Sequence, residues 1–227
     1  MVKTFFVTGT DTEVGKTFVT RALMRAARQA GKKVLGYKPV ASGCDWLGGE
    51  LRNSDALGLQ AESSIPLPYA MHNPYAFAPA IAPHIAAAQA FDPISIPRIG
   101  EGLARLKETA ADWIFAEGAG GWRLPLDERH FLSDWVKKEH LPVILVVGAR
   151  LGCINHALLT LEAIRHDGLV VAGWVLNRVD PHMSHYRENA DTLKQLISAP
   201  LLGEIPWLAE SGAEAADGFI DLSPLLK

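Results

Sequence analysis

Residues 8–17, with the sequence TGTDTEVGKT, restrict what this chain can fold into more than any other stretch. A short run of β-branched and aromatic residues at 3–7 precedes them and predicts a strand. Residues 17–30 follow, with the Ala, Arg, Leu and Met content of a helix that ends at Gly31. A strand, a glycine-bearing loop and a helix start in this order predict a phosphate-binding loop, because the N–H groups and the dipole of the helix converge on one anion.

Lys16 and Thr17 are the two side chains of this loop that carry chemistry. The Lys16 ammonium is expected to reach the outer phosphates of a nucleotide, and the Thr17 hydroxyl to hold Mg²⁺. The pattern is not strict, since Thr10 stands where the first glycine is usual and Gly9 lies one residue earlier. A bare Gly-Lys-Thr also occurs in ordinary turns, where the lysine is solvated. The strand before the loop and the helix after it favour a nucleotide site.

Alternating apolar runs and helical stretches indicate the fold class. Further strands are predicted at 33–38, 113–116, 143–147, 170–176 and 201–205. Helices are predicted at 53–60, with Asn53 or Ser54 as N-cap, at 84–90 and at 96–110, whereas the Pro-rich stretch 63–83 is expected to be a surface loop. Continuous apolar strands separated by helices predict an α/β, P-loop NTPase-like fold: a mostly parallel sheet with helices on both faces. Because no linker or repeat is evident, we expect one domain over 1–227.

Composition limits the classes of partner and the compartment. Of the 227 residues, 48% are apolar, which is enough for a well-buried α/β core. The formal net charge of −3 argues against a dedicated nucleic-acid binder, which usually carries a basic surface. We find no apolar run of membrane-spanning length and no signal peptide, and two cysteines, Cys44 and Cys153, suit a reducing compartment. A cytoplasmic protein with no membrane or nucleic-acid partner is expected.

Two carboxylates follow the strand and loop ends where ligands of such sheets bind. Glu117 ends the apolar run 113–116 and enters a glycine-rich turn, so it should point into the phosphate site. Asp55 follows the loop after residue 38 and is the second carboxylate within reach. Mg²⁺ prefers a few carboxylates together with phosphate oxygens, which both residues could complement. Asp55 could instead be an ordinary acidic residue in the first turn of a helix.

Lys38 is a second lysine at a strand end close to the phosphate loop. Two cations around one γ-phosphate suit transfer to an acceptor that is itself anionic, since they offset the repulsion between the two reactants. A lysine that extends from the strand end into solvent is the ordinary alternative. The segment 39–43 (PVASG) that follows at once favours a functional role.

Several motifs, in order along the whole chain, resemble those of the dethiobiotin synthetase family. They are residues 8–17, 36–43 (GYKPVASG), 52–57 (RNSDAL), 117–122 (EGAGGW), 141–148 (LPVILVVG), 151–156 (LGCINH) and 200–207 (PLLGEIPW). The resemblance implies an ATP-dependent ligase that converts 7,8-diaminopelargonate and CO₂ to dethiobiotin, ADP and phosphate. One amine takes up CO₂ as a carbamate, ATP phosphorylates the carbamate to a carbamic-phosphoric anhydride, and the second amine closes the ring.

The resemblance also implies roles for individual residues, with Lys16 and Lys38 as the catalytic pair. The residues implied at the diamine and its carbamate are Thr12, Lys16, Lys38 and Ser42. Those implied at Mg²⁺ are Thr17, Asp55 and Glu117. Those implied at ATP are Glu13, Val14, Gly15, Lys16 and Thr17 at the phosphates, Asp55, Glu117, Gly118, Ala119 and Gly120 beside them, and Asn177, Arg178, Pro206, Trp207 and Leu208 at the adenine.

A homodimer with the substrate at the subunit interface is implied as well. The carboxylate tail of the diamine would meet the helix start formed by Gly152, Cys153, Ile154 and Asn155 of the partner chain, in agreement with anion binding at helix N-termini. A tail-binding tyrosine is expected on the helix after Asn177, and Tyr186 lies there. In some family members this tyrosine falls three residues later, where this chain has Asn189; three residues keep the same helix face.

Two other classes share this sheet and loop. ATPase switches of the partitioning and septum-positioning type bind protein partners, but they carry a second lysine five residues before the main one, where this chain has Asp11. They also often end in a basic amphipathic helix, which residues 218–227 do not resemble. Cobyrinate-type amidotransferases need an additional glutaminase domain. An ATPase switch is therefore the main alternative to the synthetase.

Overall fold

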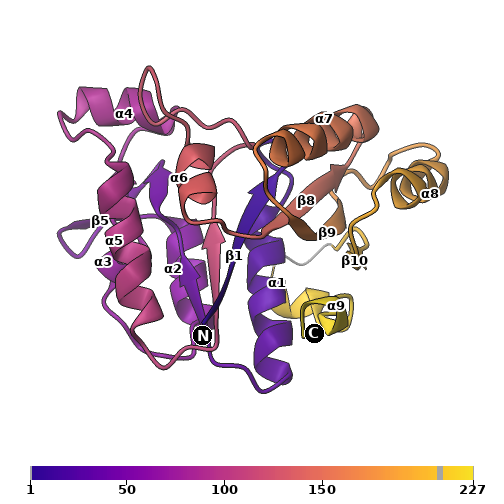
Figure 1. Ribbon diagram of the computed structural model, residues 1–227, viewed down its shortest axis with the longest axis horizontal. Coiled ribbons are helices and arrows are strands. Elements are labelled where there is room, and N and C mark those ends of the chain that lie inside the picture. The colour runs from indigo at the N-terminus through magenta and orange to yellow at the C-terminus, as the bar shows by residue number, and fades with distance from the viewer. Residues whose placement is uncertain (1, 209–211, 227) are drawn as a thin grey trace.

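A six-stranded parallel sheet forms the centre of the computed structural model, which describes residues 2–208 and 212–226 (Figure 1). Its strand order is β10-β9-β8-β1-β7-β2, and every neighbouring pair is parallel. The bounds are β1 Lys3–Gly9, β2 Val34–Tyr37, β7 Trp113–Glu117, β8 Val143–Ala149, β9 Val171–Arg178 and β10 Leu201–Ile205. The predicted mostly parallel α/β sheet is confirmed, with each strand within a few residues of its predicted place.

Alternating side chains of the strands pack against helices on the two faces of the sheet. Phe5 and Val7 of β1 pack in one cluster with α1, whereas Phe6 between them packs in another with α5 and α6. The helices of the first face are α1 Lys16–Gln29, α2 Ser54–Glu62 and α9 Ser223–Leu226, joined by the 3₁₀ turn η1 Ala213–Ala216. Those of the second face are α5 Ile96–Lys107, α6 Leu132–Lys138, α7 Cys153–His166 and α8 Tyr186–Leu196 (Figure 1). The interior strands are mostly apolar because both of their faces are covered.

The stretch 63–83 is not the surface loop that its prolines predicted. It contains α3 Tyr69–His72 and β6 Tyr75–Phe77, and β6 pairs in parallel with β3 Val40–Ser42. The side chains of Tyr69, His72, Asn73, Tyr75 and Phe77 are buried. The prediction was wrong because α3 and β6 are too short to show a hydrophobic periodicity in the sequence. Segments that are distant in the chain cover and bury them.

Three other elements complete the described part of the chain. β4 Asp45–Leu47 and β5 Glu50–Arg52 form an antiparallel hairpin, and α4 is Pro83–Gln89. The hairpin and α6 had no predicted counterpart. In the described part of the chain, no helix has the length and apolar character needed to span a bilayer. The carboxyl ends of β1, β2, β7 and β9 lie at one edge of the sheet, and the candidate site is built there.

Candidate active site

The loop between β1 and α1 has the geometry of an anion cradle. Gly15 is the N-cap of α1 with a φ of 79°, a left-handed conformation that glycine adopts without strain. No side chain of the described residues caps the helix and no acidic residue lies in its first turn, so its leading N–H groups are available to a ligand. Asn177 holds the loop in place, because its amide donates a hydrogen bond of 3.0 Å to the Val14 carbonyl oxygen. An added Cβ at Gly15 would lie 2.3 Å from the same amide nitrogen.

Lys16 turns back over the loop and is largely buried, with 8% of its surface exposed. Its Nζ donates a hydrogen bond of 3.0 Å to the carbonyl oxygen of Asp11. Burial and, secondarily, repulsion by Lys38 lower the pKa of Lys16 to about 8. The carboxylate of Asp11 forms an ion pair with Arg150, which follows β8. The ammonium therefore lies beside the cradle, only weakly held by protein acceptors.

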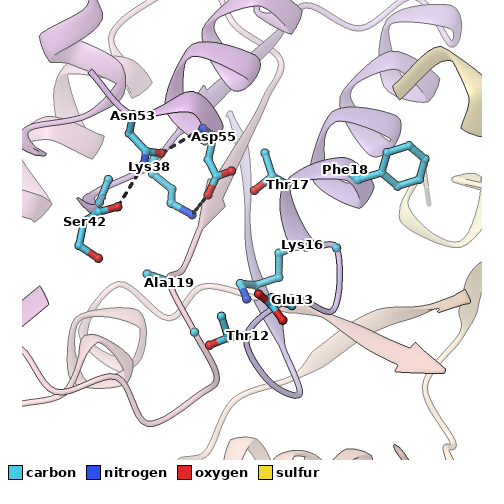
Figure 2. Close-up of a pocket in the computed structure, with 13 residues that line it drawn as sticks. Thr12, Glu13, Lys16, Thr17, Phe18, Lys38, Ser42, Asn53, Asp55 and Ala119 are labelled. Atoms are coloured by element: carbon cyan, nitrogen blue, oxygen red, sulfur yellow. Dashed lines mark hydrogen bonds and ion pairs between the residues drawn. The ribbon is translucent and has the colours of Figure 1, made fainter. Parts of the chain in front are cut away.

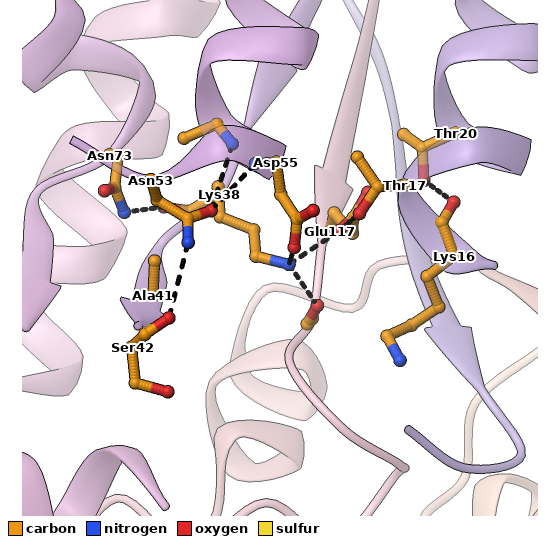
Figure 3. Close-up of polar contacts among 12 residues, drawn as sticks. Lys16, Thr17, Thr20, Lys38, Ala41, Ser42, Asn53, Asp55, Asn73 and Glu117 are labelled. Carbon is orange, nitrogen blue, oxygen red and sulfur yellow. Dashed lines mark hydrogen bonds and ion pairs between the residues drawn. The ribbon is translucent and has the colours of Figure 1, made fainter. Parts of the chain in front are cut away.

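Lys38, at the end of β2, is held far more tightly. Its Nζ donates to Glu117 Oε1 at 2.6 Å, to Asp55 Oδ2 at 3.2 Å and to the Gly118 carbonyl oxygen at 3.0 Å (Figure 3). Burial by itself would lower the pKa of Lys38, but the carboxylates of Glu117 and Asp55 outweigh it and raise the pKa. Lys38 is only 3% exposed, so the alternative of a strand-end lysine extended into solvent is wrong.

Thr17 and Asp55 line the cavity beside Lys16, and Glu117 lies buried behind them, in contact with Thr17 and Lys38. The Thr17 hydroxyl donates a hydrogen bond of 2.8 Å to Glu117 Oε1, the oxygen that also accepts from Lys38. Glu117 Oε2 is buried and has no hydrogen-bond partner among the described residues. Burial would raise the pKa of Asp55, but the charge of Lys38 opposes burial, and on balance the pKa is lowered.

This donor set fits Mg²⁺ bound together with a nucleotide. The described residues contain no group of three or more His, Cys, Asp or Glu side chains arranged to hold a metal by themselves. Mg²⁺ usually takes one or two carboxylates and completes its shell with phosphate oxygens and water. The hydroxyl of Thr17 and the carboxylates of Asp55 and Glu117 match that requirement. Among the described residues, Oε2 of Glu117 still has no hydrogen-bond partner.

Two adjoining cavities open at this edge of the sheet. The first, of about 400 Å³, is lined by Thr12, Glu13, Gly15, Lys16, Thr17, Phe18, Lys38, Ala41, Ser42, Asn53, Asp55, Ala119 and Gly120 (Figure 2). The second, of about 340 Å³, is lined by Glu13, Gly15, Phe18, Asn177, Arg178, Val179, Pro206, Trp207 and Leu208. Both cavities are lined by Glu13, Gly15 and Phe18, so the phosphate loop lies between the first cavity, which is polar, and the second, which is more open.

Most residues singled out in the sequence come together here, and a few additional ones were missed. Val14 is buried behind the loop, and Gly118 contributes its carbonyl oxygen to Lys38 rather than a cavity wall. Phe18, Ala41, Asn53 and Val179 line the cavities without having been predicted to do so. An aromatic residue directly after Gly-Lys-Thr was the available signal for Phe18. Ala41 and Asn53 lie within the motifs 36–43 and 52–57, whereas Val179 carried no signal in the sequence.

The helix start after β8 and Tyr186 line neither cavity. Gly152 is the N-cap of α7 with a φ of 93°, again without a side-chain cap, and Asn155 is exposed. The Tyr186 hydroxyl donates a hydrogen bond of 2.9 Å to Glu204 Oε1, and the Arg178 guanidinium lies 4.6 Å from its ring centroid. Burial and the Glu204 carboxylate raise the pKa of Tyr186. Within one chain, therefore, these groups are not brought to Lys16 and Lys38.

Comparison with known proteins gives full-length matches. A family model described as an AAA domain matches residues 3–215. The chain is 54% identical over 226 residues to the ATP-dependent dethiobiotin synthetase BioD of Aeromonas hydrophila subsp. hydrophila, covering 100% of both chains. It is 52% identical over 227 residues to BioD of Tolumonas auensis, again covering 100% of both. It is 54% identical over 226 residues to BioD 1 of Escherichia coli strain K12, covering 99% of this chain and 100% of the other.

Solved structures with the same fold are more distant in sequence. A ParA family ATPase from Chlorobium tepidum TLS is 18% identical with a TM-score of 0.59, covering 95% of this chain and 92% of that one. The MinD cell division protein of Aquifex aeolicus is 19% identical with a TM-score of 0.52, covering 90% and 82%. At these identities the likeness concerns the fold alone, and it confirms the predicted P-loop NTPase-like fold.

Proposed function

The chain belongs to the dethiobiotin synthetase family of ATP-dependent ligases, and from that membership we propose that it converts 7,8-diaminopelargonate and CO₂ to dethiobiotin, with ATP giving ADP and phosphate. The observation that carries the proposal within the site is the pair of buried lysines, Lys16 and Lys38, on the cavity next to the phosphate loop. Here the second lysine, Lys38, reaches the cavity from the end of β2 rather than from the loop, so that two ammonium groups line one cavity. Two suit an acceptor that is anionic when it meets the γ-phosphate.

ATP is proposed to span the two cavities. Asn177, Arg178, Pro206, Trp207 and Leu208 offer an amide and apolar walls to the adenine in the second cavity. The backbone N–H groups of residues 13–17 would then bind the phosphates, since no side chain of the described residues caps the start of α1. Ala119 and Gly120, without bulky side chains, leave room for the γ-phosphate and the acceptor in the first cavity.

Thr17, Asp55 and Glu117 are proposed to hold Mg²⁺. When bound, the ion would neutralise part of the phosphate charge. Because Lys38 already pairs with both carboxylates, Lys38 and the ion together would balance the charges of Glu117 and Asp55. Because the two carboxylates raise the pKa of Lys38, its ammonium stays protonated and can face the phosphate as a cation.

The proposed reaction has three steps. One amine of the diamine adds to CO₂ and loses a proton, giving a carbamate, which the hydroxyls of Thr12 and Ser42 on the first cavity can orient. A carbamate oxygen attacks the γ-phosphorus in line, and the bond to ADP breaks as the carbamic-phosphoric anhydride forms. The second amine then attacks the carbamoyl carbon, phosphate leaves, and a second proton is lost as the ureido ring closes. Lys16 and Lys38 stabilise the charge on the transferred group in the second and third steps.

A homodimer is proposed to complete the site. The uncapped start of α7 at 152–155 suits the carboxylate of the substrate tail, but it lines neither cavity of its own chain. Exposed Leu151 beside it, with 90% of its surface accessible, suits a contact with an apolar tail or a second chain. Tyr186 is proposed as a further contact for the tail. We also propose a cytoplasmic location, since the cysteines Cys44 and Cys153 are free and buried.

The test is ADP release measured with the diamine and bicarbonate added separately and together, with the product identified by mass. ADP release that needs both, and a product heavier than the diamine by CO₂ minus water, is expected. ADP release without the diamine, or stimulated only by a protein partner, would favour the switch ATPases whose fold this chain shares. The 52–54% identity to synthetases over the whole chain stands against that alternative.

The metal assignment has its own test. Glu117→Gln keeps an oxygen that can accept from Lys38 but removes the charge, so the Mg²⁺ concentration for half-maximal rate is expected to rise with the fold intact. Asp55→Asn is expected to act in the same direction. A Mg²⁺ titration that neither variant shifts would remove both carboxylates from the proposed metal site.

A further inference from the structure

Both backbone polar groups of Lys38 are held by the last residue of α3, His72, and by Asn73, which follows it. The N–H group of Lys38 donates to the carbonyl oxygen of His72 at 2.7 Å. The carbonyl oxygen of Lys38 accepts from Nδ2 of Asn73 at 2.6 Å (Figure 3). The same Nδ2 donates to the carbonyl oxygen of Tyr75 at 3.0 Å. Asn73 is 3% exposed, so its amide is a buried clamp on the residue that carries the proposed catalytic ammonium.

The hydroxyl of Tyr69 joins Asn73 to Asn53, the N-cap of α2. Because both protons of the Asn73 amide face carbonyl oxygens, its Oδ1 needs a donor, and the Tyr69 hydroxyl lies 2.8 Å away. With its proton used there, the hydroxyl oxygen accepts the N–H group of Asn53 at 2.7 Å. Burial raises the pKa of Tyr69, which keeps this donor protonated.

Asn53 in turn fixes two groups of the cavity. Its Oδ1 caps α2 by accepting the N–H groups of Asp55 at 3.1 Å and Ala56 at 3.2 Å. Its Nδ2 donates to the carbonyl oxygen of Ser42 at 3.3 Å, and Figure 3 shows the side chain between Ser42 and the start of α2. Asp55 and Ser42 therefore take their backbone positions from one side chain, whose own N–H group is held by Tyr69.

We propose that Tyr69 is a positioning residue that acts through Asn53 and Asn73 to hold Lys38, Ser42 and Asp55 in one mutual arrangement. The three groups come from three separate stretches of chain, and the Tyr69 hydroxyl is the atom at which their hydrogen bonds meet. The inference rests on the proposed function, since it assumes that these three groups serve one reaction. Displacements below 1 Å are enough to reduce turnover, because the reacting atoms must be aligned within a few tenths of an ångström.

Tyr69→Phe is the direct test, and Tyr75→Phe is its matched control. Both hydroxyls are in buried tyrosines and accept a backbone N–H group, but the Tyr75 hydroxyl bonds Ser95 and Pro93, away from the cavity. Tyr69→Phe leaves the Asn53 N–H group and Asn73 Oδ1 without partners. We expect kcat to fall about tenfold with a KM for ATP changed less than about threefold, because the phosphate loop is outside this network.

Amide hydrogen exchange at residues 53–56 supplies a readout that does not depend on turnover. Exchange there is expected to be faster in Tyr69→Phe and unchanged in Tyr75→Phe, since only the first variant frees Asn53. Equal kcat and equal exchange in the two variants would overturn the inference. If the wild-type chain forms no dethiobiotin, the proposed function fails, and the exchange comparison still decides whether Tyr69 positions Asn53.

Asn53→Ser provides a second variant in case Tyr69→Phe does not fold. Serine remains a good N-cap for α2 but cannot reach Ser42 as a donor. We expect a lower kcat with the helix amides still protected. Unchanged kcat in a folded Asn53→Ser protein would show that the Ser42 arm of the network has no role in positioning.

Discussion

Lys16 and Lys38 lie on the same cavity in opposite electrostatic surroundings. Two carboxylates and a carbonyl oxygen hold Lys38, and they raise its pKa despite burial. Among the described residues, the Lys16 ammonium has only the carbonyl oxygen of Asp11 as a hydrogen-bond acceptor, and burial lowers its pKa to about 8. Lys38 is thus a fixed charge built into the site. Lys16 is the lysine whose charge depends most on the arrival of phosphate.

Lys38→Ala is expected to lose about 3 kcal/mol or more of transition-state stabilisation. This loss lowers kcat roughly a hundredfold or more. The measurement is kcat at saturating ATP, diamine and bicarbonate. Lys33→Ala removes an exposed lysine just before the same strand and is the matched control. Near-normal turnover of Lys38→Ala would contradict the catalytic role of Lys38.

ATP binding is expected to take up a proton at pH 8. Near its pKa of about 8, Lys16 is partly neutral, and anionic phosphates favour its charged form, so binding raises the pKa and draws a proton from solvent. Calorimetric titrations in buffers of different ionisation enthalpy measure this uptake, and ATP affinity should weaken as the pH rises above 8. Lys16→Arg, which stays charged, should lose the uptake; the same uptake in both proteins would assign the proton elsewhere.

At the scale of the elements, α5 sets the position of β2 and hence of Lys38. The Tyr37 hydroxyl of β2 donates a hydrogen bond of 2.7 Å to the carbonyl oxygen of Ile99 on α5. Gly102, one turn further along α5, allows this close approach, since an added Cβ would lie 2.4 Å from the same hydroxyl oxygen. Gly100 on the same helix has no such contact, and an added Cβ would meet Glu139 only at 3.5 Å.

Gly102→Ala is therefore expected to lower the free energy of unfolding by about 1–3 kcal/mol through overpacking. Gly100→Ala is expected to raise it by about 0.4–1 kcal/mol, because alanine restricts the unfolded chain and favours the helix. Urea unfolding of both variants measures the difference. A stabilised Gly102→Ala protein would show that α5 and β2 can separate without cost.

At the scale of the whole molecule, the starts of α1 and α7, which no side chain of the described residues caps, lie apart in one chain. The start of α1 belongs to the cavities, and the start of α7 does not. The start of α7 would bind the carboxylate at the end of an apolar substrate tail if a second chain supplied that helix start. This arrangement is the basis of the proposed homodimer.

Mixing Lys16→Ala with Asn155→Trp tests the dimer by complementation. Each variant alone is expected to be inactive, and subunit exchange is expected to restore activity. In a heterodimer, one site carries both changes and the other carries neither. Activity is measured after exchange has been verified by mass. Complete exchange without recovered activity would show that the α7 start serves its own chain or no site.

The sequence by itself determined the features that depend on neighbouring residues. The phosphate loop, the parallel sheet and the emergence of Glu117 at a strand end follow from glycine placement and apolar periodicity, which act over a few residues. Asn53 as a possible N-cap belongs to the same group. These local preferences survive folding because the tertiary structure agrees with them.

Only the tertiary structure decided which distant groups meet. The order β10-β9-β8-β1-β7-β2 brings Glu117 to Lys38 across 79 residues. The end of α3 brings Asn73 to Lys38 across 35 residues. The stretch 63–83 looked like a loop because its stabilisation comes from burial against β2 and β3 rather than from a pattern of its own. Contacts of this kind depend on how whole elements pack, and no short-range pattern in the chain encodes them.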